Sequence, residues 1–164
     1  KKIMIPKFDK SKDDRCFKSK WLAVTKKPNI VIFEGWCVGV ESQKKKDLFI
    51  PINKLEEKKD KKRIWRLTVN KELHNKYKKI FYLIDKLIFL KVPSFKYVYK
   101  WRLLQEKKLR TKSKGNKTMS DEQVKNFVMY YERLTKNMLK ILPKKANTVI
   151  SIDKNHKLKS IKFN

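Results

Sequence analysis

Asn29-Ile-Val-Ile-Phe-Glu-Gly-Trp36 is the stretch of sequence that decides the predicted fold. Its four consecutive apolar residues, 30–33, are too few for a buried helix, and the first three of them are β-branched. A short, wholly apolar run of this kind predicts a central strand that is buried on both faces of a parallel sheet. We therefore expect an α/β protein whose sheet is organised around this strand.

An acid and a glycine follow the apolar run directly. Glu34 would stand at the carboxyl end of the predicted strand, where open α/β sheets bind their ligands. Gly35 has no side chain, so a ligand could approach the backbone there. The spacing fits equally well a carboxylate that only begins a surface loop, and both interpretations stay open on spacing alone.

The length and composition indicate one domain. The sequence shows no sign of membrane insertion or metal binding. A length of 164 residues suits a single domain with a core of its own. The chain contains no run of eighteen apolar residues and no visible secretory signal. Cys16 and Cys37 form no CxxC motif, and the two histidines show no metal-ligand spacing. These features favour a reduced, cytoplasmic protein with no membrane partner.

The net charge of +29 invites a nucleic-acid interpretation. However, 39 of the 45 basic residues are lysines, and they are scattered through every segment. Recognition of phosphates and bases favours arginine, whose planar fork binds in a bidentate manner, so specific nucleic-acid binding is disfavoured. Because lysine is the usual cation in this chain, each arginine indicates a position that needs the planar, bidentate guanidinium group. The six arginines are Arg15, Arg63, Arg66, Arg102, Arg110 and Arg133.

The rest of the chain alternates predicted short strands with helices, which favours a parallel sheet. Pro6 interrupts an edge strand over 3–8. The capping box Ser120–Gln123 begins a helix that Pro143 is expected to end. The other predicted elements are a strand or turn entry at 21–24, a solvated loop at 57–63, a helix over 69–84, a strand at 87–92, a helix over 94–111, a last strand at 147–152 and a turn at 153–156.

Two polar segments carry candidate functional residues. The loop from Asp9 to Arg15 holds three acids and an arginine, which could orient substrate hydroxyls or simply cap a turn. Arg102, Glu106 and Arg110 are spaced four apart and form one helical stripe. That stripe fits a surface ladder of ion pairs, and it fits equally well a lid helix whose arginines close over a transferred phosphate. The segment 113–118, SKGNKT, is no Walker A loop, because the first glycine of the pattern GxxxxGK[ST] is missing before its second lysine.

Six motifs together resemble the D-glycerate 3-kinases of the plant and cyanobacterial type, which belong to the P-loop kinases. They occur in that family's order, cover nearly the whole chain and include every arginine except Arg63. The motifs are IPKFDKSKDDR (5–15), VIFEGWCVG (31–39), PINKLEEKKD (51–60), WRLTVN (65–70), VPSFKYVYKWRLLQEKKLR (92–110) and MSDEQVKNFVMYYERLT (119–135).

The resemblance implies a P-loop-kinase-like parallel sheet flanked by helices and ATP-dependent phosphorylation of glycerate, with ATP and Mg²⁺ as cofactors. It implies that residues 1–164 are the carboxyl-terminal part of a single P-loop kinase domain. The family's phosphate-binding loop GxxxxGK[ST] and the strand before it do not occur in this sequence. We therefore expect an incomplete sheet that exposes apolar surface, weak ATP binding and no measurable kinase activity from this chain alone.

The resemblance also assigns roles by position. Glu34 resembles the Walker B acid, which supports Mg²⁺ and the attacking hydroxyl. Arg102 and Arg110 match a lid segment whose cations neutralise the moving phosphoryl group. The residues expected to contact substrate are Asp9, Arg15, Asn53, Glu56 and Arg66.

Two alternatives remain beside a glycerate kinase. A P-loop kinase could use another small acceptor, such as a nucleoside or pantothenate. A basic nucleic-acid-binding module would instead bind in a way that weakens steeply with salt concentration.

Overall fold

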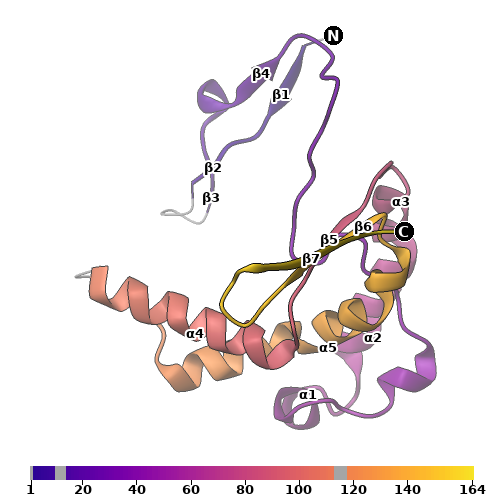
Figure 1. Cartoon of the computed structure of the whole chain (residues 1–164), viewed down its shortest axis with the longest axis vertical. Coiled ribbons are helices and arrows are strands. Elements are labelled where there is room, and N and C mark those ends of the chain that lie inside the picture. The colour runs from indigo at the N-terminus through magenta and orange to yellow at the C-terminus, as the bar shows by residue number, and fades with distance from the viewer. Residues whose placement is uncertain (1, 10–13, 113–117) are drawn as a thin grey trace. The chain divides into compact units, whose positions relative to one another are not determined.

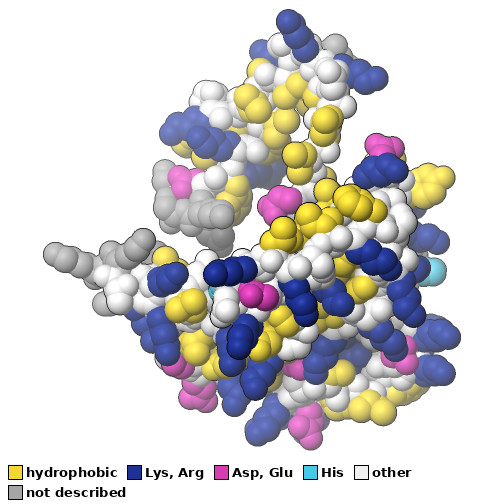
Figure 2. Space-filling view, viewed as in Figure 1, with side chains coloured by type: hydrophobic (Ala, Val, Ile, Leu, Met, Phe, Trp, Pro, Cys, Tyr) yellow, Lys and Arg dark blue, Asp and Glu magenta, His cyan; other side chains and the backbone are white. Residues whose placement is uncertain are grey.

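The structure is a computed structural model that describes residues 2–9, 14–112 and 118–164. Its chain divides into two compact units, Lys1–Gly35 and Trp36–Asn164 (Figure 1). Figure 2 shows Lys and Arg side chains spread over the visible surface of both units rather than gathered in one patch. None of the helices in the described ranges is both long enough and apolar enough to cross a membrane.

The unit Lys1–Gly35 consists of short antiparallel pairs. Strand β1 (Ile3–Ile5) pairs with β4 (Leu22–Val24), and β2 (Phe8–Asp9) pairs with β3 (Asp14–Arg15). A 3₁₀ turn, Lys18–Lys20, precedes β4. The predicted strand over 3–8 is split where Pro6 stands, because proline has no N–H for the ladder. Of the two alternatives for residues 21–24, a strand or the entry to a turn, the structure shows a strand.

The apolar run 30–33 is not a strand, so the prediction of a central buried strand is wrong for this chain. Ile30, Val31 and Ile32 are each more than three-quarters exposed, and Phe33 is 58% exposed. An extended segment becomes a strand only when a neighbouring strand completes its ladder. No strand in the described part of the chain pairs with this run. The expected exposure of apolar surface is thereby confirmed.

The sheet of the unit Trp36–Asn164 has three strands in the order β5-β6-β7. Strand β5 (Ile88–Lys91) runs parallel to β6 (Thr148–Ile152), with Ile88 opposite Thr148. Both strands and the turn after β6 were predicted. Strand β7 (Leu158–Phe163), antiparallel to β6, was not. Its lysines and its fully exposed face are typical of an edge strand and mask the usual apolar alternation.

A helical run begins soon after a 3₁₀ turn, Lys45–Leu48. Helix α1 (Lys54–Lys59) covers residues 57–59 of the solvated loop predicted at 57–63, so the prediction is wrong there, while residues 60–63 lie in neither a helix nor a strand. The Asn53 side chain caps α1, and Glu56 and Glu57 suit the positive end of its dipole. The helix predicted over 69–84 is confirmed and begins earlier. It consists of α2 (Ile64–Glu72), a π-helical turn (Leu73–Tyr77) and α3 (Lys78–Phe81).

Two long helices pack against each other beside the sheet (Figure 1). Helix α4 (Phe95–Lys112) follows β5, and α5 (Asp121–Lys145) begins at the predicted capping box of Ser120 and Gln123. Pro143 does not end α5 but lies in its last turn. The helix continues because the N–H of Ala146 still donates to Leu142, whereas proline removes only its own donor.

The core of this unit joins the helices to the sheet. Val40, Leu73, Met138 and Leu142 form one buried cluster, against which Leu87 and Phe89 pack. The expected class is confirmed: a mixed α/β fold with a parallel strand pair and flanking helices.

Candidate active site

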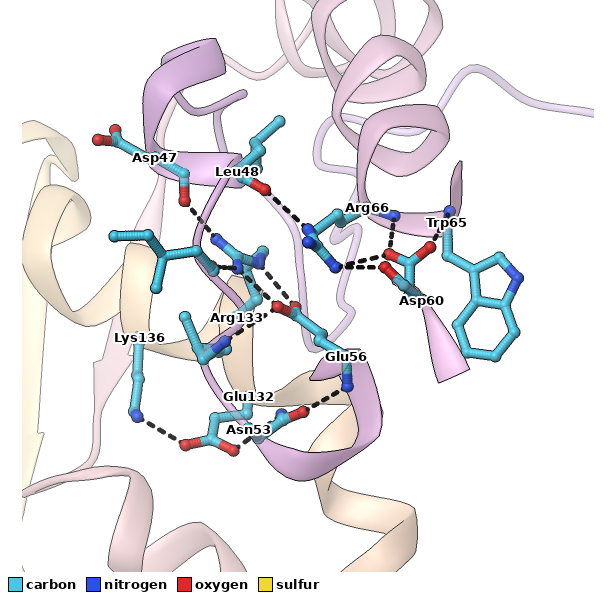
Figure 3. A network of polar contacts seen from close by, with 12 residues as sticks. Asp47, Leu48, Asn53, Glu56, Asp60, Trp65, Arg66, Glu132, Arg133 and Lys136 are labelled. Atoms are coloured by element: carbon cyan, nitrogen blue, oxygen red, sulfur yellow. Dashed lines mark hydrogen bonds and ion pairs between the residues drawn. The ribbon is translucent and has the colours of Figure 1, made fainter. Parts of the chain in front are cut away.

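Arg133 is the centre of a buried network that joins α5 to α1 (Figure 3). Its Nε and Nη2 donate to the two carboxylate oxygens of Glu56 at 2.7 and 2.6 Å. Its Nη1 and Nη2 also donate to the carbonyls of Asp47 and Ile50, both at 2.9 Å. A lysine could not make this set of contacts, because its single ammonium group has no planar fork.

Arg66 makes a second buried fork in the same region (Figure 3). Its Nε donates to the Leu48 carbonyl at 2.7 Å, and its Nη1 donates to both the carbonyl and the carboxylate of Asp60. The Asp60 carboxylate also accepts from the backbone N–H groups of Trp65 and Arg66 at the start of α2. Asp60 is therefore a helix cap and an ion-pair partner at once, and it is 3% exposed.

Asn53 completes the network from the start of α1. Its side-chain oxygen accepts from the Glu56 N–H at 3.0 Å, and its amide group donates to Met129 and Glu132 of α5. The structure thus brings together Asn53, Glu56 and Arg66, three of the residues expected to contact substrate. Their polar atoms bond to the chain itself and hold α1 and α2 against α5. Their substrate contact remains a prediction.

The surroundings of Glu56 favour the ionised form of its carboxyl group. Burial alone would raise the pKa of its carboxyl group. The hydrogen bonds from Arg133 and from the Ile52 N–H, together with the charges of Arg133 and Arg66, outweigh burial and lower that pKa. The ion pair is consequently complete at neutral pH.

Arg102 and Glu106 form the first half of the predicted stripe on α4. Arg102 Nη1 lies 2.7 Å from a Glu106 carboxylate oxygen, as the spacing of four predicts. Glu106 is only 2% exposed, and its other oxygen accepts from the Met119 N–H at 2.7 Å. That backbone hydrogen bond, followed by the charge of Arg102, lowers the pKa of Glu106. The guanidinium of Arg102 also lies over the Phe127 ring, 5.6 Å from its centre.

Arg110 pairs with α5 rather than with Glu106. Its Nη2 donates to the Asp121 carboxylate at 2.6 Å, and its Nε donates to the Met119 carbonyl at 3.1 Å. The hydrogen bond from Arg110 lowers the pKa of Asp121. The predicted ladder of ion pairs is therefore wrong for the pair of Glu106 with Arg110, because Glu106 is already held by Arg102 and Met119.

A cavity of about 420 Å³ lies beside Arg102, near the carboxyl end of β5. Leu90 and Val92 contribute to it from that end of the strand, which is the edge where parallel sheets bind ligands. Trp36 and Tyr131 form an aromatic wall, with ring centres 4.8 Å apart. Among the described residues that line this cavity, Arg102 is the one with a charge. The cavity could therefore hold an apolar group beside an anion.

Three expected site residues belong to the unit Lys1–Gly35. Asp9 on β2 stands opposite Asp14, and Arg15 on β3 stands opposite Phe8. Glu34 follows the exposed run 30–33 and is itself exposed. The middle of the acidic loop, residues 10–13, lies outside the described residues, as does most of the rejected SKGNKT segment.

The described residues contain no group of three or more His, Cys, Asp or Glu side chains that could hold a metal ion. Mg²⁺ in kinases is bound through one or two carboxylates, with substrate phosphates and water completing its shell. A single exposed carboxylate such as Glu34 fits that requirement.

Sequence reasoning missed the roles of Arg133 and Asp60. Arg133 carried a usable signal, because it is one of only six arginines among 45 basic residues. Asp60 carried none, since it does not differ by local pattern from the exposed acids around it. For Glu106 the spacing of four indicated the pair with Arg102 but not the burial of the carboxylate.

The fold is similar to the folds of several solved structures, and this chain covers about 60% of two of them. The D-glycerate 3-kinase of Cryptococcus neoformans var. grubii is 22% identical, with a TM-score of 0.77, over 99% of this chain and 60% of that chain. The YGR205w protein is 26% identical, with a TM-score of 0.70, over 98% of this chain and 57% of that chain. By fold, this chain is therefore of the α/β class to which that glycerate kinase belongs.

The sequence has curated relatives of the same kind. An uncharacterised kinase of Schizosaccharomyces pombe, mug58, is 38% identical in an alignment of 140 residues that covers 79% of this chain and 47% of the relative. The chloroplastic D-glycerate 3-kinase of Arabidopsis thaliana is 31% identical in an alignment of 134 residues that covers 79% of this chain and 26% of the relative. No family model matches the chain. The chain spans half or less of these curated relatives, and its resemblance to D-glycerate 3-kinases is confirmed.

Proposed function

We propose that this chain is part of an ATP-dependent kinase that phosphorylates D-glycerate, with ATP and Mg²⁺ as its cofactors. The observation that carries the proposal is the 31% identity to the Arabidopsis D-glycerate 3-kinase over 79% of the chain. The fold shared with the Cryptococcus enzyme supports it. We take residues 1–164 to be the carboxyl-terminal part of a single P-loop kinase domain. A cytoplasmic location remains a prediction.

The proposed chemistry needs positioned charges more than covalent catalysis. Phosphoryl transfer proceeds through a transition state whose charge is spread over the phosphoryl oxygens. Arg102 and Arg110 are the cations that would neutralise this charge. Glu106 and Asp121 bind these two guanidinium groups and so limit their rotation. When Mg²⁺ is bound, it supplies further positive charge at the phosphates.

Glu34 would support the metal and orient the attacking hydroxyl of glycerate. Asp9 and Arg15, on paired strands, are the proposed contacts to the small substrate. The buried residues Asn53, Glu56 and Arg66 would act on the substrate site mainly by holding α1 and α2 in place. This proposal follows from the position of these residues in the shared motifs and from the contacts described above.

The test uses the full-length gene product and measures ADP release with ATP and Mg²⁺. Equal concentrations of D-glycerate, a nucleoside and pantothenate are compared as acceptors. We expect turnover with D-glycerate to exceed turnover with the other two by at least about 100-fold. Preferred turnover of the nucleoside or pantothenate would assign a different acceptor on the same scaffold.

The charge of +29 favours a second candidate, a nucleic-acid-binding module. However, Arg66 and Arg133 are buried in protein contacts, and 39 of the 45 basic residues are lysines, so such a partner would meet mainly lysines. The candidate predicts nucleic-acid binding that weakens by at least about 1,000-fold between 50 and 200 mM salt. Binding of a nucleotide in a defined site would change far less over that range.

A further inference from the structure

A second cavity, of about 510 Å³, lies at the opposite edge of the sheet from Arg102. Two of its lining residues, Leu87 and Asn147, stand immediately before β5 and β6. Because these strands are parallel, both residues lie at the amino edge of the sheet. The site proposed for phosphoryl transfer uses the carboxyl edge. This cavity is therefore separate from that site.

The cavity has an apolar floor that belongs to the core. Val40, Leu73, Leu87 and Leu142 line it and are the same side chains that hold α5 against the sheet. Its volume falls in the range of small-molecule sites, which are mostly apolar with a few polar groups. The floor would accommodate the hydrocarbon part of a ligand.

An interruption of the helix shapes one wall. The N–H of Lys78 donates to the carbonyl of Leu73, five residues earlier, which is the pattern of a π-helical turn. Such turns are rare and occur often at functional sites, because one extra residue changes where the side chains point. Leu73, His74 and Lys78, at the two ends of this turn, all line the cavity.

A glycine shapes the opposite wall. Gly39 has φ +77°, and a Cβ atom placed on it would lie 2.7 Å from Cδ2 of Leu87. Only glycine fits this backbone conformation and this close approach without strain. The approach brings the following residues, Glu41 and Ser42, to the cavity beside the start of β5.

The polar groups at the cavity are mainly hydrogen-bond donors. Lys145 is paired with Glu41 at 2.6 Å, but no acid among the described residues lies within ion-pair distance of Lys78. Ser42 Oγ is 3.5 Å from Nδ1 of His74. The Asn147 side-chain oxygen accepts from the Leu87 N–H at 2.8 Å, and this leaves the amide NH₂ available as a donor. The cavity therefore has an excess of positive charge and of donors.

We propose that this cavity binds a small organic anion, a carboxylate or phosphate monoester carried on an apolar body. The anionic group would contact Lys78, with Ser42 and the Asn147 amide as further donors. The apolar body would lie on Leu73 and Leu142. Because the cavity is at the other edge of the sheet, such a ligand would bind without competing for the phosphoryl-transfer site.

The test titrates the full-length protein, labelled with ¹⁵N, with four probes: benzoate, phenyl phosphate, benzyl alcohol and inorganic phosphate. We expect benzoate or phenyl phosphate to bind at least about tenfold more tightly than the neutral alcohol and than phosphate alone, because only they combine both groups. Amide signals of Ser42, His74 and Lys78 should shift. Equal affinity for the alcohol, or shifts confined to residues far from the cavity, would overturn the proposal.

A matched pair of variants separates the cavity from the general positive charge. Lys78→Met keeps an apolar stem but removes the charge, and we expect it to weaken binding of the better anionic probe about tenfold. Lys79 is the next residue on α3 and does not line the cavity. Lys79→Met, which removes its charge, should therefore leave binding unchanged. Asn147→Asp, which keeps the acceptor for Leu87, should also weaken binding. Equal effects of the two lysine variants would assign the binding to net charge and refute the site.

Discussion

Arginine and lysine side chains make different kinds of contact in this chain. Arg66 and Arg133 are buried, and each donates several hydrogen bonds to carbonyls and a carboxylate. The lysines that form ion pairs, such as Lys76 and Lys145, do so at the surface. Surface pairs contribute little to stability, whereas breaking a buried pair leaves an uncompensated charge. Arg66 and Arg133 therefore mark points where helices are joined to other parts of the chain.

Replacing Arg133 by lysine should destabilise the chain by about 3 kcal/mol, because one ammonium group cannot satisfy Glu56 and the carbonyls of Asp47 and Ile50 together. Urea unfolding followed by circular dichroism measures the change. Arg15→Lys, at an exposed position, is the control and should change stability by less than about 0.5 kcal/mol. Equal effects of the two substitutions would show that the network does not join α1 to α5.

The lowered pKa of Glu56 predicts how stability depends on pH. A carboxyl group whose pKa is lower in the folded chain stabilises that chain at pH values above its usual pKa of 4.5. The contribution is lost as the pH falls through the folded-state pKa. Glu56→Gln should be less stable than the wild type at pH 7, and the difference should shrink toward pH 3. A constant difference across this range would contradict the assignment.

At the scale of elements, both arginines on α4, Arg102 and Arg110, are held by ion pairs. Glu106 binds Arg102 and the backbone before α5, and Arg110 binds Asp121 in the first turn of α5. The pair of helices therefore presents its two arginines in fixed positions. A lid that carried them would have to move with the start of α5.

Within the proposed kinase, Arg102→Lys should lower kcat for D-glycerate by about 100-fold while KM changes much less, because the guanidinium acts on charge that develops in the transition state. Steady-state ADP release by the full-length protein measures both parameters. Lys100→Met, on the same helix but away from the cavity, is the control. A rise in KM with an unchanged kcat would instead make Arg102 a ground-state binding residue.

At the scale of the molecule, the chain alone and the full-length protein should behave differently. The sequence contains no GxxxxGK[ST] motif, so this chain should bind ATP weakly and show no measurable phosphorylation of D-glycerate. Parallel assays of both proteins under the same conditions check this. Turnover of D-glycerate by the 164-residue chain would show that its own residues suffice for catalysis.

Local patterns determined much of this protein. The capping box of α5, the start of α4 after Pro93-Ser94 and the strands β5 and β6 follow from residues close together in sequence. Motif order sufficed to indicate the kinase resemblance. These features are predictable because caps, turns and apolar periodicity act over a few neighbouring residues.

Only the tertiary structure decided which polar residues are buried and whether an apolar run becomes a strand. Arg133 and Glu56 are 77 positions apart in the sequence, and no local sequence pattern around either residue indicates that they pair. Residues 30–33 have every local property of a buried strand and yet remain exposed. Strand formation and charge burial both require a partner from elsewhere in the chain, and a local pattern cannot supply one.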